Sequence, residues 1–510
     1  MFNLQYAGPG AYRRDAGQVH SLPATKRRTR ILFFAPKECW PPDTGAKLRN
    51  YYLARSLSQE ADVTYLGFKD NDGQDLTGSH AGPGNHSQPL ITSLSARDTV
   101  DASFADPALL FRKTISVGRS SRYSIRNVIR GALTRVPLTI LNYTTNEMAA
   151  QLSLLLTEND YDIVQMESLH LAAYLPLIRS ARSKPRVICD WHNIESELMS
   201  RYSQHQPSTP RRLYGTMTAR RLRDYEAWAI PQFDAHLTVS QRDADQISKL
   251  APDGNVFVLE NGVDIEHFRT CQAERSPSEV TGTNGATSHH PGLAMGPDAR
   301  KRLVYVGSMD YHANQDAAIH FAREIWPGIL NALPGLTFTI VGRKPSEAVK
   351  SLSLIPGVEV TGTVSDVRPY YREAIAAIVP LRVGGGSRLK ILESMAAGVP
   401  VISTVLGAEG LVVEKGENIL IAETPEDFLR AITRLSQDRV QWARLSAGGR
   451  RLVSDRYSWE SIGFRLRGIH TELLSENKPT VGRSPRADTR QETFTTVAEP
   501  AASPALDYIG

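Results

Sequence analysis

Short apolar runs alternate with amphipathic stretches along most of the chain. Residues 31–35 (ILFFA) form an apolar run between basic residues and a proline, which is typical of a strand buried in a parallel sheet. Residues 48–57 then carry apolar side chains at helical spacing, and residues 63–66 form the next apolar run. This order of strand, loop, helix and strand predicts a βαβ unit.

The same alternation continues through both halves of the chain. Further strands are expected at 163–166, 187–189, 235–239, 256–259, 303–306, 337–341, 358–361, 376–379, 401–404 and 419–421. Helices are expected at 210–229, 315–325, 367–373, 389–397, 425–435 and 440–453. The pattern predicts an α/β protein with two doubly wound, Rossmann-like domains facing a central cleft, where ligands bind beyond the carboxyl ends of the strands.

Three segments are too polar to contribute to a core. Residues 1–28, 270–300 and 476–510 are rich in charge, Ser, Thr, Gly or Pro and have few large aliphatic side chains. Such segments bury too little apolar surface to offset the entropy of ordering them, so we expect disordered tails and a disordered linker. The remaining chain divides into domains at 29–269 and 301–452 and a C-terminal helix at 453–475 that crosses back toward the first domain.

Composition limits the class of protein. Hydrophobic residues make up 41% and charged residues 22% of the 510 residues, as in globular proteins. No run approaches the about 18 apolar residues of a membrane span, and the N-terminus lacks a secretory pattern. Three scattered cysteines, at 39, 189 and 271, suit neither a disulfide framework nor a zinc site. We therefore expect a cytoplasmic protein.

The glycine-rich stretch at 384–393 (GGGSRLKILE) carries the sharpest signal. Its first residues, Gly384, Gly385 and Gly386, let backbone amides approach a ligand closely, and Ser387 is a good N-cap. The first amides of the following helix favour an anion. A tight turn before a well-capped helix is the alternative interpretation.

The charged residues of this stretch favour a phosphate site over a simple turn. Arg388 and Lys390 add two positive charges beside the helix start, as a diphosphate requires. Glu393 lies further along the helix, where it could accept hydrogen bonds from ribose hydroxyls.

Residues 384–400 (GGGSRLKILESMAAGVP) and 407–411 (GAEGL) resemble the donor-nucleotide motif of family 4 glycosyltransferases. The resemblance extends to 261–264 (NGVD), 306–308, 341–343 and 362–367, and covers roughly residues 30–475. It implies the GT-B fold, a nucleotide diphosphate sugar as donor, retention of anomeric configuration, and no cofactor or catalytic metal. It also implies that the first domain binds the acceptor and the second binds the donor, with contacts from Gly307, Ser308, Arg343, Leu389 and Glu409.

The departures from the family pattern are informative. Glu393 matches the second of two family glutamates and is implied to bind the ribose, whereas Gly385 stands at the position of the first. The first donor-domain loop, 307–314, lacks the cation that many members place there. We hypothesise that Arg388 and Lys390 supply the cations instead. The GGG-[ST]-R-L-K form resembles a subgroup found in exopolysaccharide biosynthesis.

Two places in the first half are candidates for the acceptor side. His192, in 190–195 (DWHNIE) after a strand, matches the histidine loop of the family and is implied to contact the sugar or the acceptor. A histidine that hydrogen-bonds its own loop is an equally good interpretation from the residues alone. Glu167 and His170 follow the preceding strand and are a weaker pair of candidates for the cleft. The family's acceptor loop corresponds to 41–45 with Gly45, Lys47 and Arg49, where an ordinary βα turn is the alternative.

Charge is unevenly distributed along the chain. The net charge is only +5, but residues 112–135 hold seven basic side chains and no acidic one. Arg122, Arg126 and Arg130 would share one face of a helix. No nucleic-acid-binding module is visible, so an anionic membrane surface is the partner that fits best, although a charge run is commonly a solvated face.

These observations predict a hexosyltransferase-like glycosyltransferase of polysaccharide or glycoconjugate biosynthesis. It would transfer a sugar from a nucleotide diphosphate sugar to a glycan or a polyprenyl-linked acceptor, peripherally at the inner face of the membrane. A nucleotide-sugar epimerase of the same fold and a non-catalytic sugar-nucleotide-binding protein are the alternatives.

Overall fold

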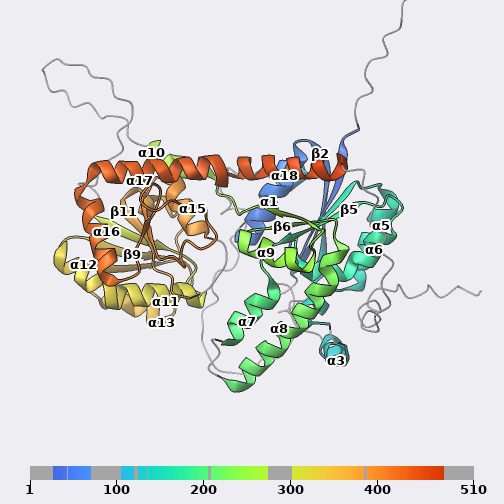
Figure 1. Cartoon of the computed structure of the whole chain (residues 1–510), viewed down its shortest axis with the longest axis horizontal. Coiled ribbons are helices and arrows are strands. Elements are labelled where there is room, and N and C mark those ends of the chain that lie inside the picture. Colours follow the sequence, from blue (N-terminus) through green and yellow to red (C-terminus); the bar gives the residue numbers. More distant parts are fainter. Residues whose placement is uncertain are drawn as a thin grey trace, which may run out of the picture.

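The computed structural model describes residues 27–42, 44–70, 105–119, 125–134, 136–204, 208–273, 301–383 and 388–475. Two α/β domains lie side by side along its longest axis (Figure 1). Each domain is built on one sheet in which every pair of described neighbouring strands is parallel. This arrangement agrees with the doubly wound pattern expected from the alternating apolar runs.

The first sheet has the strand order β3-β2-β1-β4-β5-β6-β7. Its strands are β1 (Thr29–Ala35), β2 (Ala61–Asp70), β3 (Lys113–Arg119), β4 (Ile163–Met166), β5 (Arg186–Trp191), β6 (Ala235–Thr238) and β7 (Asn255–Val258). Its helices are α1 (Gly45–Ser58), α2 (Pro107–Leu110), α3 (Ile125–Leu133), α4 (Leu138–Leu141), α5 (Asn146–Glu158), α6 (Leu175–Ser180), α7 (Glu195–Gln204), α8 (Thr209–Ala229), α9 (Gln241–Leu250) and α10 (Ile265–Ala273).

The second sheet has the strand order β10-β9-β8-β11-β12-β13. Its strands are β8 (Arg302–Val306), β9 (Thr337–Val341), β10 (Val358–Gly362), β11 (Ala374–Val379), β12 (Val401–Ser403) and β13 (Leu420–Ile421). The helices after residue 301 are α11 (His312–His320), α12 (Trp326–Ala332), α13 (Glu347–Lys350), α14 (Arg368–Arg372), α15 (Leu389–Ala396), α16 (Pro425–Gln437), α17 (Arg439–Leu452) and α18 (Trp459–Ser475).

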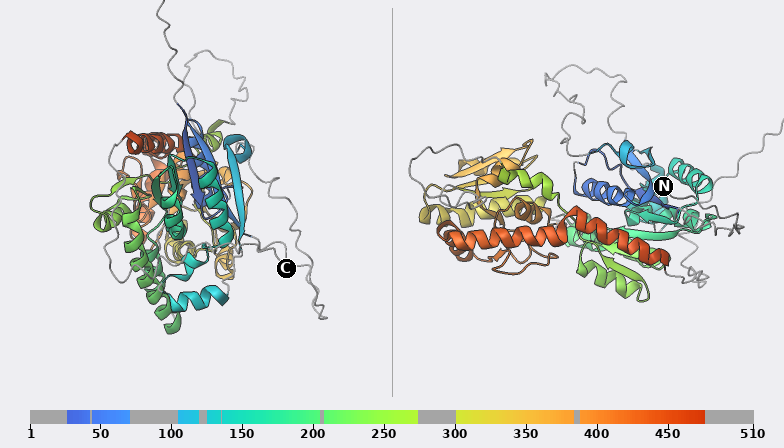
Figure 2. Two further views of the ribbon diagram at one scale, coloured as in Figure 1. Left: turned by 90° about the vertical axis from the view of Figure 1, so that its right-hand side faces the viewer. Right: turned by 90° about the horizontal axis from the view of Figure 1, so that it is seen from above.

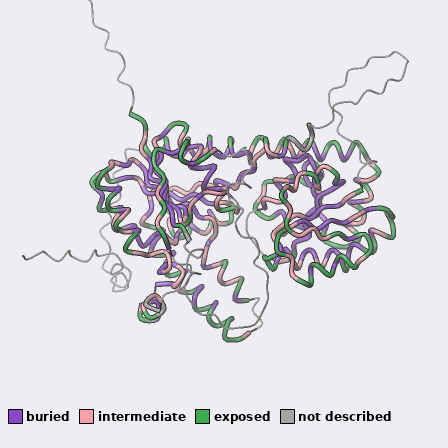
Figure 3. Tube along the Cα trace, turned by 180° about the vertical axis from the view of Figure 1, so that it is seen from behind, coloured by how far each residue is buried: buried purple, intermediate pink, exposed green. Residues whose placement is uncertain are grey.

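The continuous apolar run of β1 reflects burial on both faces of the sheet. Leu32 and Phe34 belong to one core cluster, while Ile31 and Phe33 belong to the cluster on the other face. Buried residues are concentrated along the strands of both domains, with exposed residues on the surrounding helices (Figure 3). Strands buried on two faces are apolar at almost every position, so such strands can be recognised from the sequence.

Helix α18 joins the two domains. It continues the line of α17 and runs along the first domain beside α1 (Figures 1 and 2). Trp459 stacks on Tyr52 with ring centroids 4.9 Å apart, and Leu466 is buried in the core beneath α1. A Cβ on Gly463 would lie 2.0 Å from Ser56 Oγ, so this close helix contact requires a glycine. Helix α18 thus completes the core that β1 and α1 form in the first domain.

The basic stretch at 112–135 differs from the helical expectation at its start. Residues 113–119 form β3, an edge strand paired with β2. Arg119 is buried, with its guanidinium 4.4 Å from the centroid of the Tyr143 ring. Arg122 and the side chain of Arg126 lie outside the described residues. A half-exposed edge strand alternates polar and apolar residues, so it lacks the apolar run by which the other strands were found.

The segments expected to be disordered fall almost wholly outside the described residues. Two edges differ from the expected boundaries. Arg27, assigned to the N-terminal tail, donates two hydrogen bonds to Asp162, at 2.8 and 2.9 Å. Helix α10 extends to Ala273, past the expected start of the linker at residue 270.

Candidate functional site

Each sheet has one point where the chain reverses its direction of winding. In the first sheet this switch point lies between β1 and β4, and in the second between β8 and β11. The loops that leave the carboxyl ends of such neighbouring strands diverge to opposite faces, which leaves a crevice for ligands. Glu167 follows β4, and Gly307 follows β8. Both candidate half-sites therefore lie where the fold predicts binding.

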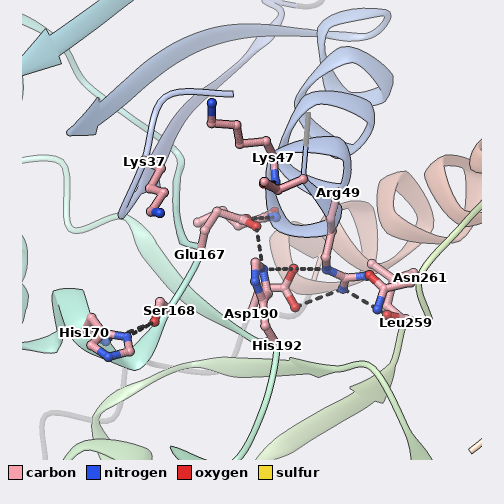
Figure 4. Close-up of polar contacts among 12 residues, drawn as sticks. Lys37, Lys47, Arg49, Glu167, Ser168, His170, Asp190, His192, Leu259 and Asn261 are labelled. Atoms are coloured by element: carbon pink, nitrogen blue, oxygen red, sulfur yellow. Dashed lines mark hydrogen bonds and ion pairs between the residues drawn. The ribbon is translucent and has the colours of Figure 1, made fainter. Parts of the chain in front are cut away.

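Arg49 and Asp190 form a buried ion pair at the edge of the first half-site (Figure 4). Arg49 Nε donates to Asp190 Oδ2 at 2.7 Å and Nη2 donates to Oδ1 at 2.9 Å. The remaining guanidinium hydrogens reach the carbonyls of Leu259 and Glu260 and Oδ1 of Asn261. Since every donor is used and the side chain is buried, Arg49 holds the interdomain junction. The expectation that it contacts the acceptor does not fit this position.

Glu167 and His192 lie together beside this ion pair (Figure 4). His192 Nε2 is 3.6 Å from Glu167 Oε2 and 3.8 Å from Asp190 Oδ2. Burial and the nearby Asp190 charge raise the pKa of Glu167 to about 7, partly offset by His192. A carboxyl group with such a pKa exchanges a proton easily near neutral pH.

A line of hydrogen bonds connects Glu167 to α18. Gln165 Nε2 donates to Glu167 Oε1 at 2.7 Å, and Gln165 Oε1 lies 2.8 Å from His470 Nε2. Burial lowers the pKa of His470 to about 3, so its imidazole is neutral. Because the Gln165 amide nitrogen faces Glu167, its oxygen must accept from His470, which fixes the proton of that ring on Nε2. The far end of the chain thus helps to orient the Glu167 carboxylate.

The remaining candidates of the first domain do not join this group. Gly45 is the exposed first residue of α1, after the N-cap Thr44. Lys47 is half-buried and extends away from Glu167 and Asp190 (Figure 4). His170, the expected partner of Glu167, instead shares a hydrogen bond with Ser168 at 2.7 Å.

Lys390 forms the centre of the second half-site. Its amine donates to Asn314 Oδ1 at 2.6 Å and lies 4.9 Å from the centroid of the Tyr305 ring. Burial and the neighbouring Arg388 charge lower the pKa of Lys390 to about 7. Asn314 also donates to the carbonyl of Ser308 at 2.8 Å, which ties the loop after β8 to the start of α15.

The loops after β8 and β9 contact each other near Lys390. Arg343 Nε donates to Ser308 Oγ at 2.8 Å, and Ser308 Oγ donates to Asp310 Oδ1 at 2.6 Å. A Cβ on Gly342 would lie 1.7 Å from the carbonyl oxygen of Gly307, so the two loops meet at glycines. The loop from 307 to 314 has no cation of its own, but Arg343 and Lys390 reach it from neighbouring elements.

Arg388 contacts different side chains from Lys390 and lines a pocket between the two domains. It is buried, and it donates to the backbone oxygen and to Oε2 of Glu409, both at 3.3 Å. Glu409 Oε1 also lies 3.3 Å from Nη1 of Arg242 in the first domain. These side chains line an interdomain pocket together with Asn193 and Ile194, which follow His192. The His192 loop and the start of α15 therefore face one cleft.

Glu393 and Leu389 follow on α15 and are half-buried. Burial raises the pKa of Glu393 to about 7, with Lys390 opposing the shift. Among the described residues, no hydrogen bond reaches the Glu393 carboxylate. Gly384, Gly385, Gly386 and Ser387 lie outside the described residues.

Glu167, Asp190 and His192 place three possible ligand atoms within 4.8 Å of one another, close enough for a metal ion. Both oxygens of Asp190 already accept hydrogen bonds from Arg49, however, and that guanidinium would lie beside the ion. The chemistry of the group suits an ion pair with an adjacent acid and imidazole better than a cation site.

Sequence reasoning missed several of these residues. Asn314 was not predicted, because only the charged residues of the loop after β8 were considered. A polar residue that follows a strand at a switch point could have indicated it. Gln165 and His470 gave no signal, because they are 305 positions apart and meet only through α18. Asp190 was recognised only as a neighbour of His192.

Comparison with known proteins supports the same class for both domains. Residues 90–267 match the family model "Glycosyltransferase Family 4", and residues 300–438 match "Glycosyl transferases group 1". Glycogen synthase of Mycobacterium tuberculosis is 23% identical over 259 residues, 48% of this chain and 55% of that protein. Phosphatidyl-myo-inositol mannosyltransferase of Mycobacterium leprae is 26% identical over 195 residues, which are 37% of this chain and 51% of that protein. The chain spans about half the length of these curated relatives.

Solved structures give the fold class. HepE of Anabaena, crystallised with UDP and glucose, superposes with a TM-score of 0.53 at 12% identity, covering 87% of this chain and all of that one. Sucrose-phosphate synthase of Thermosynechococcus elongatus gives 0.55 at 15% identity, covering 88% and 99%. The chain has the α/β GT-B fold, and its domains are similar to glycosyltransferases of family 4 and group 1.

In the described part of the chain, no helix has both the length and the apolar character needed to cross a bilayer.

Proposed function

We propose that this protein is a glycosyltransferase that moves a sugar from a nucleotide diphosphate sugar to a glycan or lipid-linked acceptor in polysaccharide or glycoconjugate biosynthesis. The family matches support the reaction class. The similarity to HepE, solved with UDP and with UDP-glucose, supports the donor class. The acceptor class and the pathway rest on the resemblance of the GGGSRLK motif to a polysaccharide-biosynthesis subgroup.

The observation that carries this proposal is the position of Lys390. Its half-buried amine lies at the β8–β11 switch point, beside the loop that starts at Gly307 and at the first turn of α15. An amine with a pKa near 7 in such a place gains a full charge when an anion binds. A diphosphate there would be contacted by Lys390 and the helix amides, with Arg343 at the rim and Glu393 available for ribose hydroxyls.

Charge stabilisation by these groups accounts for departure of the diphosphate without a metal. As the glycosidic bond breaks, negative charge develops on the leaving phosphate. Lys390 and the amides at the start of α15 are already fixed in place, so little reorganisation is needed. Arg388 contributes when its contact with Glu409 exchanges for phosphate. In this proposal Glu167 and His192 bind the acceptor hydroxyl on the opposite side of the cleft, and the anomeric configuration is retained, as in the family it resembles.

The test is a calorimetric screen of nucleotide diphosphate sugars, followed by product analysis with a panel of glycan and polyprenyl-linked acceptors. Lys390→Ala should weaken donor binding by about tenfold or more, while Lys350→Ala, an exposed lysine paired with Glu347, should not. Turnover should persist after exhaustive chelation. If the free donor sugar is epimerised, the protein is a nucleotide-sugar epimerase instead. If the donor binds but no sugar is transferred to any acceptor, the protein is a non-catalytic sugar-nucleotide-binding protein.

A further inference from the structure

Helices α3 and α8 present an apolar and strongly basic surface at one end of the first domain. Five large apolar side chains on them expose between 53% and 82% of their area: Ile129, Leu133, Leu213, Tyr214 and Met217. We call these five the α3–α8 surface. Figures 1 and 2 show α3 near α8 at this end of the first domain, in two perpendicular views. Isolated exposed apolar residues are common, but a cluster of five on two adjacent helices is not.

The side chains of the two helices face the same region. Arg221 of α8 donates to the carbonyl of Gly131 in α3 at 2.7 Å, which fixes the contact between the helices. Tyr214 and Met217 precede Arg221 by seven and four residues, so they lie on the same side of α8 as the arginine. On α3, Ile129 and Leu133 are four residues apart and share one face. None of these four belongs to a core cluster of the described residues.

The charge around this surface is mainly positive. Neither 125–133 nor 209–223 contains an aspartate or a glutamate, and the first acidic residue of α8 is the exposed Asp224. The exposed or half-exposed arginines of these segments are Arg130, Arg211, Arg212, Arg220, Arg221 and Arg223. A second copy of the chain docked here would bring arginine against arginine, which is unfavourable. Apolar side chains surrounded by cations instead match the interface of an anionic bilayer, where the rings and aliphatic groups enter the headgroup boundary and the guanidinium groups meet phosphates.

We infer that the α3–α8 surface docks this protein on an anionic lipid membrane. The location differs from the sequence-based expectation, because β3 takes the first part of the basic stretch into the sheet and buries Arg119. The projecting helix α8, far along the chain, supplies most of the cations. Its sequence alone gives no reason to place it beside α3.

The position of this surface suits a lipid-linked acceptor. Helix α7 starts at Glu195, directly after the His192 loop, and leads outward to α8 (Figure 1). Ten helical residues span ~15 Å, so a membrane touching the outer half of α8 lies within reach of an acceptor headgroup in the cleft. Only this consequence rests on the proposed function; the docking itself is independent of it.

The test is cosedimentation of the full chain with vesicles of phosphatidylcholine alone or mixed with an equal part of phosphatidylglycerol. We expect binding to the anionic vesicles, weakening as salt is added. Replacing Arg212, Arg220 and Arg223 by Gln should lower the partition coefficient by about a hundredfold, at roughly fivefold for each cation. Leu213→Ser with Met217→Ser should lower it by about tenfold for each side chain, including at high salt.

Matched control variants make the same kinds of substitution on the second domain. Leu354→Ser with Val440→Ser removes two side chains that are 84% and 80% exposed on the second domain, and Gln at Arg323, Arg439 and Arg451 removes three of its arginines. Circular dichroism checks that every variant is folded. Equal effects of control and test variants, or no vesicle binding by the parent chain, would overturn the inference. So would a dimer that only the apolar variant disrupts, or binding to a single-stranded oligonucleotide but not to vesicles.

Discussion

At the scale of single residues, the candidate site depends on three ionisable groups whose pKa values are shifted by their surroundings. Burial brings the pKa of Glu167, Lys390 and Glu393 to about 7, so acids and amine alike titrate near neutral pH. Arg49, by contrast, acts through its buried ion pair with Asp190. The shifts of the Glu167, Lys390 and Glu393 pKa values arise because burial leaves these groups with too little water and too few opposite charges.

The first prediction concerns Lys390. A bound diphosphate favours the charged amine and raises its pKa, so at a pH about one unit above 7 donor binding should take up nearly one proton. At a pH one unit below, uptake should be close to zero, and affinity should fall as pH rises through 7. Calorimetry in two buffers of different ionisation enthalpy measures this uptake.

Lys390→Arg provides the contrast, because a guanidinium keeps its charge throughout. That variant should bind donor with little proton uptake, whereas Lys350→Arg should behave like the parent chain. Equal uptake by the parent and Lys390→Arg would assign the proton to another group.

The second prediction concerns Glu167. If its carboxylate accepts a hydrogen bond from the acceptor hydroxyl, transfer should decline as pH falls through about 7, where the carboxylate becomes protonated. Glu167→Gln should lower kcat by about a hundredfold and remove this acidic limb. The measurement is a pH–rate profile at saturating donor, with the exposed Glu158→Gln as control. An unchanged limb in Glu167→Gln would exclude this role.

At the scale of elements, α18 acts on the site from the far end of the chain. Its His470 bonds to Gln165 of β4, and Gln165 in turn donates to the Glu167 carboxyl group. Its apolar face fills the core beneath α1, so the polar line is enclosed on all sides. An enclosed hydrogen bond is strong, and a partner left without one is costly.

The third prediction tests this line. Gln165→Leu removes the donor to Glu167 Oε1, which should raise the pKa of that carboxyl further and move the acidic limb of the pH–rate profile to higher pH. It also leaves His470 Nε2 without its acceptor, so the free energy of unfolding should fall by about 1–3 kcal/mol. Urea unfolding measures the second effect, and the exposed Gln59→Leu is the control. Lost stability with an unmoved limb would indicate a purely structural Gln165.

At the scale of the whole molecule, the cleft is closed on one side by charges from both domains. Glu409 connects Arg388 of the second domain to Arg242 of the first, and Arg242 also contacts Glu197 at 3.1 Å. Glu409, Arg242 and Glu197 are partly exposed, so the contacts between them add little to stability but can bias how far the domains lie apart.

The fourth prediction follows from this contact. Arg242→Glu places a third carboxylate beside Glu409 and Glu197, so the domains should separate more often in the donor-free protein. Small-angle scattering should show a larger radius of gyration for this variant, while its unfolding midpoint stays close to that of the parent. Arg439→Glu, on a distant helix of the second domain, should leave the scattering curve unchanged. A common curve for all three proteins would show that this contact does not set the spacing.

Much of the fold could be predicted from local sequence. The strands at 31–35 and 376–379 were recognisable because burial on two faces favours an unbroken apolar run. Edge strand β3 was not, since it carries exposed polar residues and sits within a basic stretch. The individual residues Lys390, Glu393, His192 and Glu167 were identified as candidates, but not the partners that determine their chemistry.

The sequence by itself determined the two parallel sheets and the loops at their carboxyl ends, because residue type and spacing decide which segments are buried and which turns can approach a ligand. Only the tertiary structure decided that Arg49 serves Asp190 instead of the acceptor, that Arg388 and Lys390 point to different neighbours, and that α18 reaches Glu167. The physical reason is that pKa values and hydrogen-bond partners depend on distances between groups far apart in the chain. Those distances exist only after the sheets and α18 have packed together.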